Sequence, residues 1–201
     1  MLRLSAPALV CAARLHGETG VIARLLTEDY GLISGYVAGG KGRVLRPVLI
    51  PGNLVSAELS ARSDSQLPAL KLELVASRGP WLGEPLAAAA ITWATALTSA
   101  TLPERHAYPP LYSALGGLLD AICHAPSARG WAPALAAYEV LLLRELGFGA
   151  PPLRPHPDDF PATLVALAKL GPLLARHALA TTGPDVMGAR AVLMERLGRM
   201  G

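Results

Sequence analysis

The first 80 residues hold five short runs in which apolar residues follow one another or alternate with polar ones. The clearest alternation is at 54–60, where Val55, Ala57 and Leu59 are separated by serines and a glutamate. A period of two is typical of a half-buried strand. The expected strands are 7–15, 20–27, 32–38, 54–60 and 69–77, the last with Leu70, Leu72 and Leu74 on its apolar side. Five strands without a helical period among them predict a small closed β-barrel.

After a hinge at 81–85, the apolar period lengthens to that of a helix. Leu86, Ala90, Trp93 and Leu97 share one helical face, and prolines open the next two helices. The expected helical segments are 86–100, 109–122, 133–147, 162–170, 173–180 and 186–197, with a proline-dense connector at 150–161. We therefore expect an α+β protein, with a five-stranded barrel over 1–79 and an all-α domain over 80–201.

One glycine-rich segment, 31–54, concentrates positive charge. It carries Lys41, Arg43 and Arg46, and no acidic residue occurs between 30 and 57. Glycines let the backbone bend sharply and approach a ligand closely. Three cations projected from such a bend beside a sheet suit a phosphate backbone better than a small apolar ligand.

The distribution of charge supports an anion-binding first domain. Residues 1–78 hold nine lysines and arginines against six acidic residues, whereas 79–201 hold nine of each, so the whole net charge of +3 lies in the first part. Four further cations lie in or at the ends of the expected strands: Arg14, Arg24, Lys71 and Arg78. Tyr36 is the neighbouring aromatic residue that could stack on a base. So few aromatic residues predict salt-sensitive, sequence-indifferent binding through the backbone.

Catalytic and metal sites are not expected. Gly35, Gly40 and Lys41 approach a P-loop pattern, but Gly42 stands where that motif needs Ser or Thr, and prolines at 47 and 51 prevent a helix from following. No nucleophile or acid–base constellation is evident, and the five histidines lack metal-ligand spacing. The sequence thus predicts a protein that is not an enzyme and that uses no cofactor.

Three further patterns bear on location. Cys11 and Cys123 lie far apart in apolar surroundings, which indicates buried, reduced thiols. The uncharged window 85–103 is rich in alanine and threonine, which favours a buried helix over a membrane span. The N-terminal residues lack a signal-peptide cleavage pattern, and we expect a cytoplasmic protein.

Four motifs, in order along the chain, resemble those of a known family. They are HGETGVIARLLTEDYGLISGYVAGGKGR (16–43), LIPGNLVSAELSAR (49–62), LPERHAYPPLYSAL (102–115) and YEVLLLRELGFG (138–149). GARAVLMERL (188–197) is similar to the end of the same family. The chain resembles the RecO family of bacterial DNA repair and recombination mediators.

The resemblance implies an N-terminal OB-fold and a helical C-terminal domain. It also implies binding to single- and double-stranded DNA, annealing of complementary strands, and help in loading the RecA recombinase. The implied partners are RecR and the acidic tail of single-strand binding protein (SSB), and the implied location is at the nucleoid. The family's basic loop maps onto Lys41, Arg43 and Arg46.

This sequence departs from the family pattern in two places. Many relatives carry a cysteine-containing, sometimes zinc-binding insertion where residues 150–161 contain no cysteine, so a metal is not expected. The helix that carries an Arg before its aromatic–Glu pair in many relatives has Ala136 and Ala137 before Tyr138. Arg129 or Arg144 would then have to hold the acidic tail.

A second class of function remains open alongside DNA binding. Lysines and arginines on an exposed turn are often only solvated. The chain would then be a non-enzymatic protein-interaction adaptor whose barrel is structural. Retention of DNA at low salt distinguishes the two classes.

Overall fold

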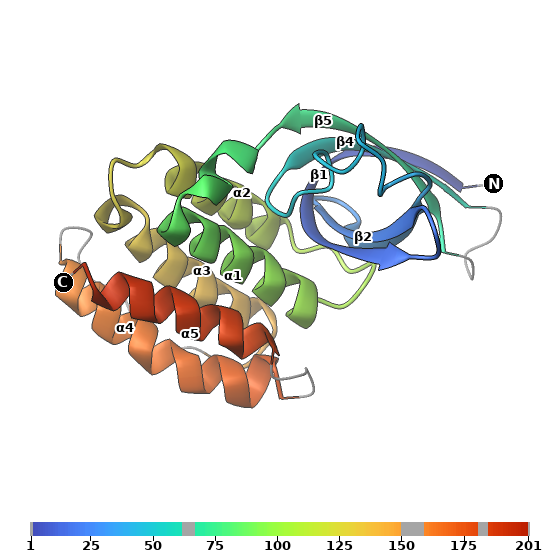
Figure 1. The fold of residues 1–201 in the computed structure, drawn as a ribbon. Helices are drawn as coiled ribbons and strands as arrows, with labels where there is room; N and C mark the ends of the chain where they lie inside the picture. Colours follow the sequence, from blue (N-terminus) through green and yellow to red (C-terminus); the bar gives the residue numbers. More distant parts are fainter. Residues whose placement is uncertain (1, 62–66, 150–158, 181–184, 201) are drawn as a thin grey trace. The chain divides into compact units, whose positions relative to one another are not determined.

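The computed structural model describes residues 2–61, 67–149, 159–180 and 185–200. Its first part is a closed five-stranded barrel (Figure 1). The strands are β1 (Leu2–His16), β2 (Gly20–Thr27), β3 (Gly31–Val37), β4 (Leu54–Ala61) and β5 (Ala69–Ala76). They are ordered β1-β2-β3-β5-β4, and β3 and β5 pair in parallel while the other ladders are antiparallel. This is the OB-fold arrangement that the sequence predicted.

The barrel closes because every second side chain on its strands is apolar and points inward. The inward positions form one core that includes Val10, Leu25, Val55 and Leu70, all buried. Burying a leucine or valine side chain stabilises the fold by about 1.5–3 kcal/mol. The outward positions of β1, β2 and β3 are therefore free to carry polar and charged residues.

Two details of the strands differ from the prediction. β1 begins at Leu2 instead of residue 7, because its first half pairs with β4 and its second half with β2, with a register shift between Val10 and Ala12. Leu74 is 44% exposed, although its alternation with Leu70 and Leu72 predicted burial. Leu74 still pairs with Val55 in the phase of Leu70 and Leu72, but it lies near the end of β5, where a register shift follows it.

Five α-helices make up most of the remaining chain (Figure 1). They are α1 (Pro85–Thr101), α2 (Pro109–His124), α3 (Ala132–Glu145), α4 (Phe160–Leu173) and α5 (Asp185–Gly198). The pieces expected at 162–170 and 173–180 are continuous, because α4 runs directly into a π-helical turn, Leu174–Ala178. The α+β class is thus confirmed.

Local signals in the sequence mark the start of α4 and the end of α3. The Asp159 carboxylate accepts a hydrogen bond from the Ala162 N–H at 2.8 Å, which caps the start of α4. Gly147, with a φ of 81°, follows the end of α3, where a left-handed residue stops a helix. Trp93 and Trp131 are both buried in the helical part of the chain.

The chain divides into two compact units that do not follow a single cut in the sequence. One consists of Met1–Gly83 with Leu102–Tyr112, and the other of Glu84–Thr101 with Ser113–Gly201. We call them the barrel unit and the helical unit. The segment 102–112 is held to the barrel by a hydrogen bond from the Arg105 N–H to the Leu32 carbonyl, at 2.9 Å. A Cβ at Gly31 would lie 1.9 Å from the His106 carbonyl oxygen, so this close approach requires glycine.

Cys11 and Cys123 are both buried and neither is in a disulfide, as expected. In the part of the chain that the structure describes, no helix is long and apolar enough to cross a membrane.

Candidate nucleic-acid interface

Arg14, Arg24 and Tyr36 share the outer face of β1, β2 and β3. Arg14 pairs with Ile22, which pairs with Tyr36, and in the adjacent row Arg24 pairs with Ser34. Directly opposed residues in an antiparallel ladder project from the same face. We call this surface the strand face. The structure therefore brings together three of the predicted site residues that lie on different strands.

An acidic side chain, that of Glu104, also lies on the strand face. Its carboxylate is 3.5 Å from the Arg24 guanidinium and accepts a hydrogen bond from the Ser34 hydroxyl. Arg14, Arg24 and Ser34 line a shallow hollow together with Glu104. The carboxylate thus occupies a position beside a cation that a phosphate oxygen would also favour.

The ring of Tyr36 is positioned by two neighbours. A Cβ at Gly20 would lie 2.2 Å from a carbon of the ring, so the ring covers this glycine. The imidazole of His16 meets it edge-on, with ring centroids 6.1 Å apart. This contact joins the end of β1 to β3, because β2 pairs with both strands.

Lys41 fixes the basic loop to the turn of the β1–β2 hairpin. Its Nζ donates to the Gly17 carbonyl at 2.8 Å, and its backbone N–H donates to the Thr19 carbonyl at 3.2 Å. Arg43 and Arg46 are exposed on the same loop. The acid of the turn, Glu18, is also exposed. The three cations are therefore held next to the hairpin that carries Arg14.

Asn53 anchors the other end of this loop, a role that sequence reasoning missed. Its buried side-chain amide donates to the carbonyls of Pro47 and Val48, at 2.8 and 3.1 Å. Its Oδ1 accepts from the Arg78 N–H at 2.7 Å. The Pro-Gly-Asn sequence at 51–53 signals a turn, but not these distant partners.

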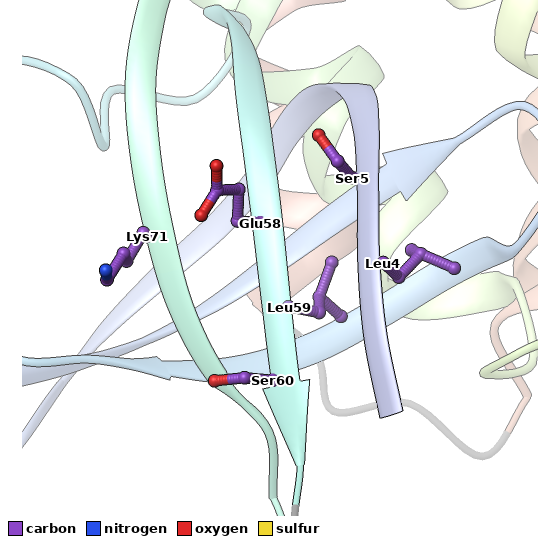
Figure 2. A pocket seen from close by; sticks show the side chains of 6 residues that line it. All are labelled: Leu4, Ser5, Glu58, Leu59, Ser60 and Lys71. Atoms are coloured by element: carbon purple, nitrogen blue, oxygen red, sulfur yellow. The ribbon is translucent and has the colours of Figure 1, made fainter. Parts of the chain in front are cut away.

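Lys71 lies on a different part of the barrel (Figure 2). It is opposite Glu58 across the β4–β5 ladder and lines a hollow of about 360 Å³ with Leu4, Ser5 and Leu59. Opposed charges on one face lower the field that a phosphate would experience. Lys71 is thus not part of the strand face.

Arg78 is buried, with only 6% of its surface exposed. A guanidinium at this depth does not reach a phosphate outside the protein. The structure does not bring Arg78 together with the other predicted residues, and we leave it out of the interface that we propose.

The motif around Tyr138 belongs to the core of the helical unit. Ala136, Tyr138 and Glu139 are all buried, and the Tyr138 and Thr98 hydroxyls share a 2.5 Å hydrogen bond. Of the two cations considered for an acidic tail, Arg129 lies 4.8 Å from the centre of the Phe160 ring, and Arg144 is exposed.

Glu139 is the acid of a buried network. It accepts hydrogen bonds from the Trp93 indole at 2.7 Å and from Arg190 at 2.8 and 3.1 Å. Burial raises the pKa of the Glu139 carboxyl, and the bonds from Arg190 and Trp93 oppose that rise. Arg190 also donates to the Leu167 carbonyl at 2.6 Å, so the network joins α1, α3, α4 and α5.

Among the described residues, no group of three or more His, Cys, Asp or Glu side chains lies close enough together to hold a metal ion.

Comparison with known proteins follows the division into barrel and helices. An OB-type barrel with cations on its strand face, followed by helices, defines the general class of oligonucleotide-binding-fold proteins. Residues 1–78 match the family model for the recombination protein O N-terminal domain, and residues 82–152 match that for its C-terminal domain. The chain belongs to the RecO family.

Relatives named DNA repair protein RecO support this assignment. The one from Rhodospirillum centenum is 44% identical over 143 residues, which cover 71% of this chain and 56% of the relative. That from Rhodospirillum rubrum is 41% identical over 152 residues, 74% of this chain and 60% of the relative. That from Gluconacetobacter diazotrophicus is 40% identical over 147 residues, covering 72% and 58%. The chain therefore spans less than two thirds of the length of these relatives.

Proposed function

We propose that this protein is a non-enzymatic DNA repair and recombination mediator that binds DNA through its barrel unit. The observation that carries the proposal is the placement of Arg14, Arg24 and Tyr36 on one strand face, beside a basic loop that Lys41 fixes to the β1–β2 hairpin. Membership of the RecO family and the names of the relatives support it.

Binding would act mainly through phosphates. Each lysine or arginine that contacts a phosphate releases condensed counterions, which favours binding at low salt. A protein that neutralises two strands at once lowers their mutual repulsion and promotes pairing of complementary strands. We therefore propose binding to single- and double-stranded DNA and annealing as the activity.

The helical unit would dock protein partners. We propose RecR and the acidic tail of SSB as direct partners, RecA as an indirect one, and the nucleoid as the place of action. Exposed apolar side chains on this unit, such as Phe148, Val165 and Val192, support a docking role. These side chains equally suit the alternative, an adaptor that does not bind DNA.

A triple substitution in the basic loop tests the proposal. Changing Lys41, Arg43 and Arg46 to alanine is expected to weaken binding of labelled single-stranded DNA. The slope of log affinity against log salt should fall by about 0.7 for each phosphate that the variant no longer neutralises. Fluorescence anisotropy over a salt titration measures both quantities.

The matched control removes the same charge from the helical unit. Arg144, Lys169 and Arg176 are exposed there, and their replacement by alanine should leave DNA affinity close to that of the parent. If the loop variant and the control variant bind equally well, the basic loop is not the DNA site. If the parent protein fails to retain DNA at low salt, the adaptor is the better description.

A further inference from the structure

An apolar hollow lies between the β1–β2 hairpin and the segment 40–51. Its volume is about 530 Å³, which is within the range of small-ligand sites. The walls are formed by aliphatic side chains and a proline: Ala13, Leu15, Val21, Leu49, Ile50 and Pro51. Leu15 is 70% exposed, so the hollow opens to solvent.

Close packing of the basic loop shapes one wall of the hollow. A Cβ at Gly40 would lie 2.8 Å from the side chain of Val21, so the loop backbone contacts this strand directly. The anchors at Lys41 and Asn53 hold the two ends of the loop. The wall is therefore preformed.

Two of the loop cations, Lys41 and Arg46, also line this hollow. It thus offers apolar walls next to fixed positive charge, the combination that suits an apolar group attached to an anion. Arg43, exposed between the two, continues the charge along the loop. Three cations in a row match the successive phosphates of a nucleic-acid strand. A ligand with a single carboxylate would need only one of them.

We propose that the hollow receives an unstacked nucleobase of a single DNA strand whose phosphates contact Lys41 and Arg46. This inference rests on the proposed function and adds to it a binding site for one nucleobase. The lining contains no aromatic side chain among the described residues, so contact with aliphatic walls replaces stacking. Seating a base without reading its hydrogen-bonding edge would allow any sequence to bind.

The test compares two oligonucleotides that have the same phosphates. One is oligo-dT, and the other is an oligonucleotide of equal length built from abasic units. The ratio of their affinities is the base preference, and we expect about tenfold for the parent protein. Leu15→Ser, which removes an apolar wall, should bring this ratio close to one.

Control variants separate the hollow from other surfaces. Val44 is 81% exposed on the same loop but does not line the hollow, so Val44→Ser should keep the base preference. Circular dichroism checks that each variant is folded. If Tyr36→Leu loses the base preference while Leu15→Ser keeps it, the base stacks on the strand face, and the hollow is not its seat.

The remaining outcomes distinguish the inference from the proposed function. Equal affinity of the parent for both oligonucleotides, with the salt effect of the loop variant intact, overturns the base seat and leaves DNA binding in place. An unchanged affinity in the triple loop variant overturns DNA binding itself. If Leu15→Ser abolishes binding of an oligo-aspartate peptide ending in leucine but keeps the base preference, the hollow is a peptide site.

Discussion

Single residues of the candidate nucleic-acid interface were only partly predictable. Lys41, Arg43 and Arg46 lie within six positions of the sequence, so their clustering follows from local composition alone. Glu104 accepts a hydrogen bond from Ser34, 70 positions away in the sequence. No local sequence pattern predicts that the two residues meet. The burial of Arg78 likewise depends on the packing around it, and an arginine at a strand end is usually exposed.

The position of Glu104 leads to a prediction about affinity. Glu104→Gln removes the carboxylate beside Arg24 and should strengthen DNA binding. A DNA phosphate would then no longer compete with the Glu104 carboxylate for Arg24, and the carboxylate would no longer repel it. Exposed ion pairs contribute up to about 1 kcal/mol, so the gain should be up to about fivefold. Anisotropy titrations of labelled DNA measure the change.

The control for this prediction is Glu145→Gln, which changes the net charge equally. Glu145 is exposed at the end of α3, in the helical unit. An equal gain in both variants would mean that net charge, and not the site beside Arg24, controls affinity.

Cys11 gives a second prediction at this scale. Burial raises the pKa of its thiol from the ordinary 9.0 to about 12. Between these values the unfolded chain loses the thiol proton and the folded protein keeps it, so stability falls as the pH rises. This contribution reaches about 1.4 kcal/mol per pH unit.

Urea unfolding from about pH 8 to about pH 10.5 checks the effect, with Cys11→Ala as the comparison. Alanine has no proton to lose, so the parent should lose more stability than the variant over this range. Parallel curves for the two proteins would contradict the assignment.

At the scale of elements, the strands were predictable because alternation reports burial directly. The extra length of β1 was not predictable, because its first half pairs with β4 and its second half with β2. The pieces expected at 162–170 and 173–180 were predicted as separate, yet α4 contains Pro172 near its end and continues into a π-helical turn. The anchoring of the basic loop through Asn53 also needed the assembled barrel.

The buried network of the helical unit predicts a large effect. Arg190→Met leaves the Glu139 carboxylate without its cation, and breaking a buried pair costs about 3–5 kcal/mol. The pKa of Glu139 should rise further in this variant. Its stability should therefore fall as the pH rises from the ordinary carboxyl range through that raised value.

Far-UV circular dichroism during urea unfolding, at about pH 5 and about pH 8, measures the loss. The double variant Glu139→Gln, Arg190→Met is the control, because it has no carboxyl at this place and should lose the added pH dependence. A single Arg190→Met variant as stable as the parent at both pH values would show that the pair contributes little.

For the whole molecule, the order of barrel and helices could be predicted, because the period of the apolar pattern changes near residue 80. Which residues belong to each of the two units could not be predicted. Residues 102–112 comprise the link after α1 and the first turn of α2, yet they pack with the barrel, through Gly31 and Leu32. Contacts of this kind join distant parts of the chain, and a periodic pattern carries no information about them.

The pairing of Glu139 with Arg190 has a consequence for synthesis. The two residues are 51 positions apart, and the acid leaves the ribosome first. Until α5 emerges, the interior formed by the preceding helices contains a carboxylate with no guanidinium to balance it. The helical unit should therefore stay open on the nascent chain until α5 has emerged.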